Sequence, residues 1–251
     1  MNAVLETREI TRFFGAVKAA DHVSVQIDAG QIVGIVGPNG SGKTTFINIV
    51  TGYLKPAQGA ILFKGRDVTG LNPRQLTKLG ITRSFQIPQL YTRLSILENM
   101  LIALSIQSGQ QWQFWQPLKT RPRIDEALQI LDQFSFPHRP EQKVSVLPEG
   151  GRKLLDVALS FALHPTLLLL DEPTSGISVD EKFGVMDTLV GVLKNSGITT
   201  VFIEHDMDVV ARYAERVIVF AEGSILARGR PAEIFAMEDV RRHVLGEAPD
   251  R

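Results

Sequence analysis

A glycine-rich run that follows a short apolar segment carries the clearest chemistry of the chain. GPNGSGKT, residues 37–44, fits the pattern G-x-x-x-x-G-K-[ST] at every fixed position and leads into the helical run TTFINIV. Glycines let a backbone approach phosphate oxygens closely, while the N–H groups of the loop and of the helix start point at the anion. Lys43 adds a positive charge at the β and γ phosphates, and the Thr44 hydroxyl suits Mg²⁺. The run therefore predicts a phosphate site with these contact residues: Gly37, Pro38, Asn39, Gly40, Ser41, Gly42, Lys43, Thr44 and Thr45.

Two acids and a histidine follow other apolar runs, where they could complete this site. In TLLLLDEP, Asp171 and Glu172 come directly after four leucines, and His205 follows TTVFIE. Asp171 is expected to hold Mg²⁺ through water, and Glu172 to orient or polarise an attacking water. Parallel strands bring such strand ends to the phosphate loop, so His205 is expected to act there. No such context surrounds the other histidines, which we expect on the surface or in packing positions: His22, His138, His164 and His243.

These side chains need a sheet to position them, and the hydrophobic pattern predicts one. Short apolar runs of strand length alternate with segments of helical period, which favours an α/β fold with a mostly parallel sheet. Val23, Val25 and Ile27 alternate with polar residues, which is typical of a half-exposed strand in an antiparallel sheet near the N-terminus. The predicted buried strands are Gln31–Val36, Ile81–Phe85, Leu167–Leu170 and Thr199–Ile203.

Between Gln86 and Pro165 the strand signals stop and helical spacing takes over. LSILENMLIAL and RIDEALQILDQF repeat apolar residues every three and four positions, which predicts a helical subdomain over residues 87–164. The intervening QSGQQWQFWQPLKTRP is rich in glutamine and holds both tryptophans. It is either a surface loop with two packing aromatics or a partner contact. LPEGGRK is typical of a helix start, with Pro148 and Glu149 in the first turn.

Composition excludes several classes of protein. The 251 residues include no cysteine, so disulfides and thiolate metal sites are excluded, and five scattered histidines do not favour structural zinc. The 27 basic residues balance 27 acidic ones, which does not favour a dedicated nucleic-acid binder. The N-terminal residues lack the apolar core of a signal peptide, and no apolar run approaches the roughly 18 residues that span a bilayer. We expect a protein of a reducing compartment that does not cross a membrane by itself.

Four motifs together resemble the nucleotide-binding subunits of ATP-binding cassette (ABC) transporters. They are GPNGSGKTT, RSFQ, LLLLDEPTSGI and IEHDM, and in this order and spacing the resemblance covers essentially the whole chain. It implies a P-loop NTPase cassette with a catalytic core over residues 1–86 and 165–230, the helical subdomain, and a helical tail over residues 231–251. It also implies that two such subunits enclose two ATP molecules head to tail, with Mg²⁺. Hydrolysis then opens this sandwich and drives membrane subunits.

The resemblance also assigns residues outside the phosphate loop. Phe14 is expected to stack on adenine with Val17 beside it, and a core position is the alternative for Phe14, since Phe13 is adjacent. Gln86 is expected to contact Mg²⁺ and the attacking water, and it begins a loop expected to face the membrane subunit. SGIS resembles the loop that crosses the dimer interface, with Ser178 in place of its usual Asp. The implied metal residues are Thr44, Gln86 and Asp171, and the implied catalytic residues are Glu172, His205 and Gln86.

The largest departure from the family pattern lies at its signature loop. The pattern L-S-G-G-Q aligns with LPEGG, residues 147–151, where only Leu147 and Gly150 match. Pro148 removes a hydroxyl and an N–H that would face the partner's γ-phosphate, and Glu149 brings an acid close to a triphosphate. We hypothesise that this segment forms a weak half-site. Efficient hydrolysis would then need a different partner ATPase with a better signature.

Longer phrases are similar to the ATPases of branched-chain amino acid uptake systems and of their urea and amide relatives. They are FGAVKAADHVSVQIDAG, QIPQLYTRLSILENMLIA, the L-x-x-G signature and the tail RGRPAEIFAMEDVRRHVLG. The likeness implies two permease subunits, a second ATPase subunit, an extracytoplasmic substrate-binding protein, and a peripheral location on the cytoplasmic face of the cell membrane. The alternatives are the ATPase of another transporter, such as a lipopolysaccharide-type exporter, and a soluble cassette ATPase outside transport. The single cassette and the neutral charge do not favour the last class.

Overall fold

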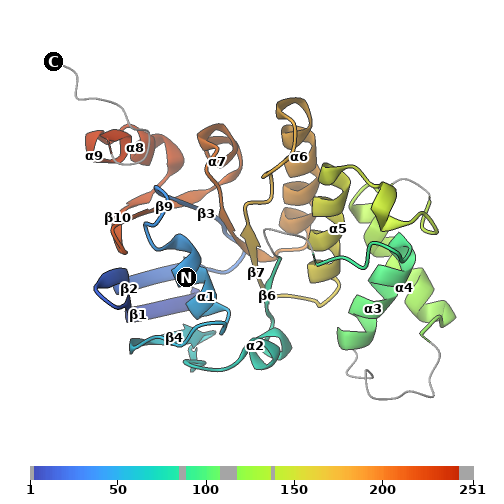
Figure 1. The fold of residues 1–251 in the computed structure, drawn as a ribbon, viewed down its shortest axis with the longest axis horizontal. Coiled ribbons are helices and arrows are strands. Elements are labelled where there is room, and N and C mark those ends of the chain that lie inside the picture. Colours follow the sequence, from blue (N-terminus) through green and yellow to red (C-terminus); the bar gives the residue numbers. More distant parts are fainter. Residues whose placement is uncertain (1–2, 85–88, 108–117, 137–138, 243–251) are drawn as a thin grey trace.

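The strands of the chain form two sheets (Figure 1) in the computed structural model, which describes residues 3–84, 89–107, 118–136 and 139–242. The first sheet is antiparallel, in the order β2 (Val17–Asp28), β1 (Ala3–Phe14), β4 (Gln58–Phe63) and β5 (Arg66–Asp67). The second has the order β10 (Ser224–Gly229), β9 (Arg216–Ala221), β3 (Ile32–Val36), β8 (Thr199–Ile203), β7 (Leu167–Asp171) and β6 (Ile81–Arg83). Its pairs are parallel, except that β10 runs antiparallel to β9. The predicted α/β fold with an N-terminal antiparallel portion is therefore confirmed.

The parallel sheet is buried on both faces, because several helices pack on one face, and the antiparallel sheet together with the helix of residues 43–50 packs on the other. Along β7, Leu168 and Leu170 join one hydrophobic cluster, while Leu167 and Leu169 join the second. Side chains of a strand alternate between faces, so a strand buried on both sides is a continuous apolar run. This explains why four leucines in succession precede Asp171.

Helices surround the parallel sheet, and the longer ones lie together on one side. Figure 1 shows α3 and α4 (green) at the opposite end of the molecule from β1 and β2 (blue). The helices are α1 (Lys43–Val50), α2 (Pro73–Leu79), α3 (Ile96–Gln107), α4 (Arg121–Gln133), α5 (Glu149–Phe161), α6 (Val179–Asn195), α7 (Met207–Tyr213), α8 (Pro231–Phe235) and α9 (Glu238–Val240). In the described part of the chain, no helix is both long and apolar enough to cross a bilayer.

Two local expectations need correction. Pro148 does not lie in the first turn of α5, because it is the N-cap with extended backbone, and the helix begins at Glu149. The strand expected over Ile81–Phe85 ends at Arg83 in the described residues, and Phe85 lies outside them. The first strand, β1, carries no clear alternation in the sequence, since its pairing with β2 shifts register at several positions.

Candidate functional site

The phosphate loop joins β3 to α1 and is shaped so that only glycine fits at two of its positions. Gly37 and Gly42 have φ angles of 150° and 103°. A Cβ atom on Gly37 would stand 2.2 Å from the carbonyl oxygen of Phe220, and one on Gly42 would stand 2.4 Å from that of Ala19. Carbonyl oxygens of β9 and β2 therefore lie too close to the loop for a side chain at either position, which leaves its backbone bare at both. This is the close backbone approach that a phosphate cradle needs.

Two polar side chains of the loop are buried in ways that suit an anion. Lys43 is 5% exposed, and its Nζ donates to the carbonyl oxygens of Gly37 at 2.7 Å and Pro38 at 2.9 Å. Burial lowers the pKa of Lys43, and the carboxylates that follow the leucines of β7 oppose this shift. The Ser41 hydroxyl is buried and has no hydrogen-bond partner among the described residues. An unsatisfied buried hydroxyl leaves a donor for a ligand oxygen.

A cleft of about 290 Å³ opens beside this loop. Val17 of β2 borders it, and Phe14, opposite Val17 in the strand pairing, is 50% exposed. The Arg12 guanidinium lies 5.3 Å from the centroid of the Phe14 ring. The alternative core position for Phe14 is therefore wrong, although Phe14 itself does not line the cleft. The lining residues are Val17, Ala19, Asn39, Gly40, Ser41, Gly42, Lys43, Thr44, Thr45, Glu172 and His205.

Asp171 ends β7 and is held by an arginine that the sequence did not single out. The Nη2 atom of Arg83 lies 2.5 Å from Oδ2 of Asp171, and Nη1 lies 2.6 Å from Oδ1 of Asn48 in α1. Both members of the ion pair are buried, with side chains 9% and 6% exposed. Arg83 ends β6, the parallel neighbour of β7, so strand pairing brings the two residues together. The pair fixes Asp171 against α1, one helical turn beyond Thr44.

Glu172 and His205 meet at the edge of the cleft. The Nε2 atom of His205 lies 3.0 Å from Oε1 of Glu172. Glu172 has a φ of 49°, a left-handed conformation that is uncommon outside glycine and is often found at functional sites. Its N–H donates to the carbonyl oxygen of Ile203 at 3.0 Å, and Lys153 of α5 donates to its carbonyl oxygen at 3.3 Å. Contacts from two elements thus hold the acid in this conformation beside the phosphate loop.

The segment aligned with the family signature is more exposed. Pro148 and Glu149 are exposed, whereas Gly150 is buried, and a Cβ atom on Gly150 would stand 3.1 Å from Val185 Cγ2 of α6. No side chain caps the N-terminus of α5. The Nη2 atom of Arg152 donates to the carbonyl oxygen of Ser145 at 2.9 Å, and its Nη1 atom lies 4.0 Å from Oε2 of Glu149. The start of α5 therefore presents an acid and a proline to its surroundings in place of a hydroxyl.

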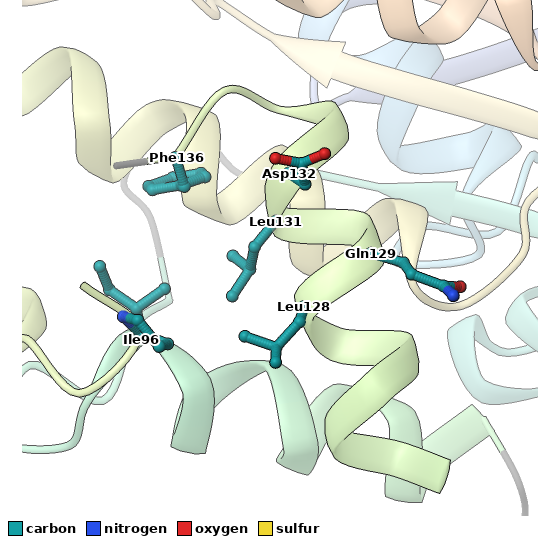
Figure 2. A pocket seen from close by; sticks show the side chains of 7 residues that line it. Ile96, Leu128, Gln129, Leu131, Asp132 and Phe136 are labelled. Carbon is teal, nitrogen blue, oxygen red and sulfur yellow. The ribbon is translucent and has the colours of Figure 1, made fainter. Parts of the chain in front are cut away.

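A larger hollow, of about 470 Å³, lies away from these residues, between α3 and α4. Figure 2 shows Leu128, Leu131 and Phe136 around it, opposite Ile96. Its lining is mainly apolar and includes none of the predicted site residues. The smaller cleft at the phosphate loop is the one with convergent polar groups, which is what marks a candidate site.

The structure leaves some predicted residues apart from this cleft. His22 and His164 lie on the surface, with side chains 64% and 54% exposed. Gln86 falls outside the described residues, as do His138, His243, Trp112 and Trp115. Sequence reasoning missed Arg83 and Lys153. The available signal was a charged residue inside an otherwise apolar element, as in ITRSF.

Comparisons with known families and sequences agree with this site. A family model described as ABC transporter matches residues 20–175. A probable branched-chain amino acid transport ATP-binding protein, LivG, from Archaeoglobus fulgidus is 33% identical over 97% of this chain and 95% of its own length. The high-affinity branched-chain amino acid transport ATP-binding protein LivG from Salmonella typhimurium is 35% identical over 94% of both chains.

Solved structures give the same picture. An ATP-binding cassette of an ABC transporter in its ADP conformation matches with a TM-score of 0.86 and 31% identity, over 98% of this chain and 100% of the other. A dimeric ATP-binding cassette in a post-hydrolysis state, bound to ADP and Pi, matches with a TM-score of 0.75 and 26% identity, over 90% of this chain and 98% of the other.

Proposed function

Because this chain belongs to the ABC transporter family, whose ATP-binding cassettes hydrolyse ATP, we propose that it powers an importer of branched-chain amino acids or related small polar solutes. The observation that carries the choice of substrate class is the similarity to branched-chain amino acid transport ATP-binding proteins over nearly the whole chain. A family core alone would fit many transporters. The shared length, including the tail, favours this group.

ATP binds, in this proposal, with its phosphates along the loop of residues 37–45. The unpartnered Ser41 hydroxyl, the buried Lys43 and the glycines that admit no Cβ support a phosphate ligand there. Val17 and Phe14 hold adenine at the exposed end of β1 and β2, where an aromatic ring is accessible for stacking.

Mg²⁺ fits beside the same loop, because hydroxyl and carboxylate oxygens are the ligands it prefers. Thr44, Gln86 and Asp171 would hold it. The ion supplies positive charge to the phosphate oxygens when bound. Asp171 is oriented for this role by Arg83, which binds one of its two oxygens.

Hydrolysis is assigned to Glu172 and His205. Glu172 orients and polarises the attacking water from its place in the lining of the cleft beside the phosphate loop. His205 holds that carboxylate through the 3.0 Å contact between its Nε2 atom and Oε1 of Glu172, and it lines the same cleft. Gln86 contacts the same water.

The second half of each site comes from another ATPase subunit, whose signature loop closes on the γ-phosphate. The similarity to a dimeric cassette bound to ADP and Pi supports a paired arrangement. This chain's own signature loop offers Gly150 to the partner's site, but Pro148 and Glu149 weaken its contribution. We propose that the partner ATPase carries the stronger signature.

Two permease subunits and an extracytoplasmic substrate-binding protein complete the proposed transporter, with this chain peripheral on the cytoplasmic face of the membrane. The test is reconstitution of the chain in proteoliposomes with the permease, second ATPase and binding-protein subunits of the proposed transporter. We expect ATP-dependent uptake of labelled leucine or isoleucine, which Glu172→Gln abolishes and an excess of unlabelled valine suppresses. Uptake of urea or a short amide without uptake of leucine would instead assign the transporter to urea or amide import. ATP-dependent movement of substrate in the opposite direction would contradict an importer.

A further inference from the structure

A buried acid that the proposed function does not use lies directly before His205. Glu204 follows the last residue of β8 and is 3% exposed. Burial raises the pKa of Glu204, because removal from water disfavours the charged form of a carboxylate. Buried polar groups of this kind persist in proteins where hydrogen-bond donors satisfy them. The identity of those donors therefore shows what the acid connects.

The donors to Glu204 come from two different loops. Oε1 accepts the backbone N–H of Thr174 at 2.9 Å and the hydroxyl of Thr174 at 2.7 Å. Oε2 accepts the backbone N–H of His205 at 3.2 Å. Thr174 is itself buried, at 7% exposed. The carboxylate thus ties the turn that follows β7 to the turn that follows β8.

The same two turns are joined a second time by the candidate catalytic pair. His205 Nε2 lies 3.0 Å from Glu172 Oε1, and the Glu172 N–H donates to the carbonyl oxygen of Ile203 at 3.0 Å. Thr174 follows Glu172 by two residues, so the contacts close a ring through Glu172, Thr174, Glu204 and His205. Two short chain segments joined by hydrogen bonds at both ends constrain each other, so the position of each side chain depends on the others.

We infer that Glu204 is a positioning residue that fixes the distance between Glu172 and His205, with Thr174 as its anchor on the loop after β7. The inference rests on the proposed roles of Glu172 and His205 in ATP hydrolysis. The expected interface loop, residues 175–178, directly follows Thr174. Glu204 therefore also links that loop to the acid and imidazole, so a partner subunit that moves the loop changes their geometry.

Four variants separate positioning from mere support of the fold. Thr174→Val removes the hydroxyl that Glu204 accepts but keeps the N–H, and Thr174→Ser restores the hydroxyl. Glu204→Gln keeps the shape and removes the charge, but it sets an amide N–H group against one of the donors. Thr7→Val is the matched control, because Thr7 is 2% exposed and its hydroxyl donates to the Val23 carbonyl oxygen at 3.2 Å in the antiparallel sheet.

The full chain, assembled with the permease and ATPase subunits of the proposed transporter, is assayed for kcat, KM, affinity for a fluorescent ATP analogue, and melting temperature. We expect Thr174→Val and Glu204→Gln to lower kcat by about tenfold, because displaced catalytic groups lose rate more than binding. KM and nucleotide affinity should stay within about twofold of wild type. Thr174→Ser and Thr7→Val should keep kcat within about twofold. Glu204→Gln should lower the melting temperature slightly, because its amide N–H group faces a backbone donor that the carboxylate accepts, so Thr174→Val is the deciding variant.

Two results would overturn the inference. One is a kcat for Thr174→Val equal to that of Thr7→Val. The other is a loss of nucleotide affinity in Thr174→Val that matches its loss of kcat, because that pattern indicates a damaged fold. A wild-type complex that neither binds nor hydrolyses ATP would instead contradict the proposed function, which keeps the two failures apart.

Discussion

The two regions expected to contact nucleotide, called here the phosphate half and the signature half of the site, differ in how firmly other residues hold their side chains. The phosphate half comprises residues 37–45 with Asp171, Glu172 and His205, and each of its acids is held by a named partner. The signature half comprises residues 147–151, where Pro148 and Glu149 are exposed and no side chain caps the helix. Catalytic groups need fixed positions before the reaction begins. The contrast supports our proposal that this chain supplies the phosphate side of the site and that another ATPase subunit supplies the stronger signature.

Removal of the buried ion pair between Arg83 and Asp171 should give the largest effect, a loss of stability in the phosphate half. Arg83→Met leaves Asp171 buried without its cation, so the free energy of unfolding should fall by about 3 kcal/mol in urea titrations. Arg8→Met is the matched control, because Arg8 pairs with Glu6 at 2.6 Å while 60% of its side chain is exposed. That variant should unfold as wild type does. Equal losses from both variants would show that the phosphate half has no special support.

The glycine cradle gives the next effect. Gly42→Ala places a Cβ atom 2.4 Å from the carbonyl oxygen of Ala19, so affinity for an ATP analogue should fall about 100-fold, or about 2.7 kcal/mol. The control is Gly65→Ala, which has a φ of 75° but no described atom within 4 Å of the added Cβ. It should lose stability through its backbone and keep full nucleotide affinity. An unchanged affinity of Gly42→Ala for the ATP analogue would contradict a phosphate site that depends on a bare backbone at this position.

The acid of the signature half gives the smallest effect. Glu149→Gln removes a like charge from the expected approach of the partner's triphosphate, so turnover of the assembled complex should rise about two- to fivefold. The control is Glu126→Gln, because Glu126 is an exposed acid of α4 that pairs with His164 at 3.5 Å. This variant should leave the turnover of the complex unchanged. A fall in turnover for Glu149→Gln would mean that this acid assists the partner site.

Most of the phosphate half could be predicted because its chemistry is local in sequence. The loop of residues 37–44, the acids after the leucines and His205 each follow a short buried strand, and the order of those strands sets their meeting point. Pairing in the parallel sheet also followed from continuous apolar runs. The first strand, β1, escaped prediction because Glu9, with a φ of 51°, interrupts the alternation that marks a half-buried strand, and the pairing with β2 shifts register there.

The supporting residues could not be predicted because their roles depend on contacts between distant segments. Arg83 reaches Asp171 across 88 positions, and Thr174 reaches Glu204 across 30. A charged residue at the end of an apolar strand is visible in the sequence, but its partner is decided by strand order and loop shape. The sequence pattern likewise could not show that Pro148 would precede α5 as its N-cap.

The central claim is tested most directly by the ATP turnover of the purified chain, measured alone and again with the neighbouring ATPase and permeases. Glu172→Gln and Pro148→Ser are measured beside wild type. We predict that the lone chain turns over ATP at least about tenfold more slowly than the complex, that Pro148→Ser narrows this gap, and that Glu172→Gln removes the activity of its own site in the complex. Rapid turnover by the lone chain, unchanged by Pro148→Ser, would contradict a weak signature half and the need for a second kind of ATPase.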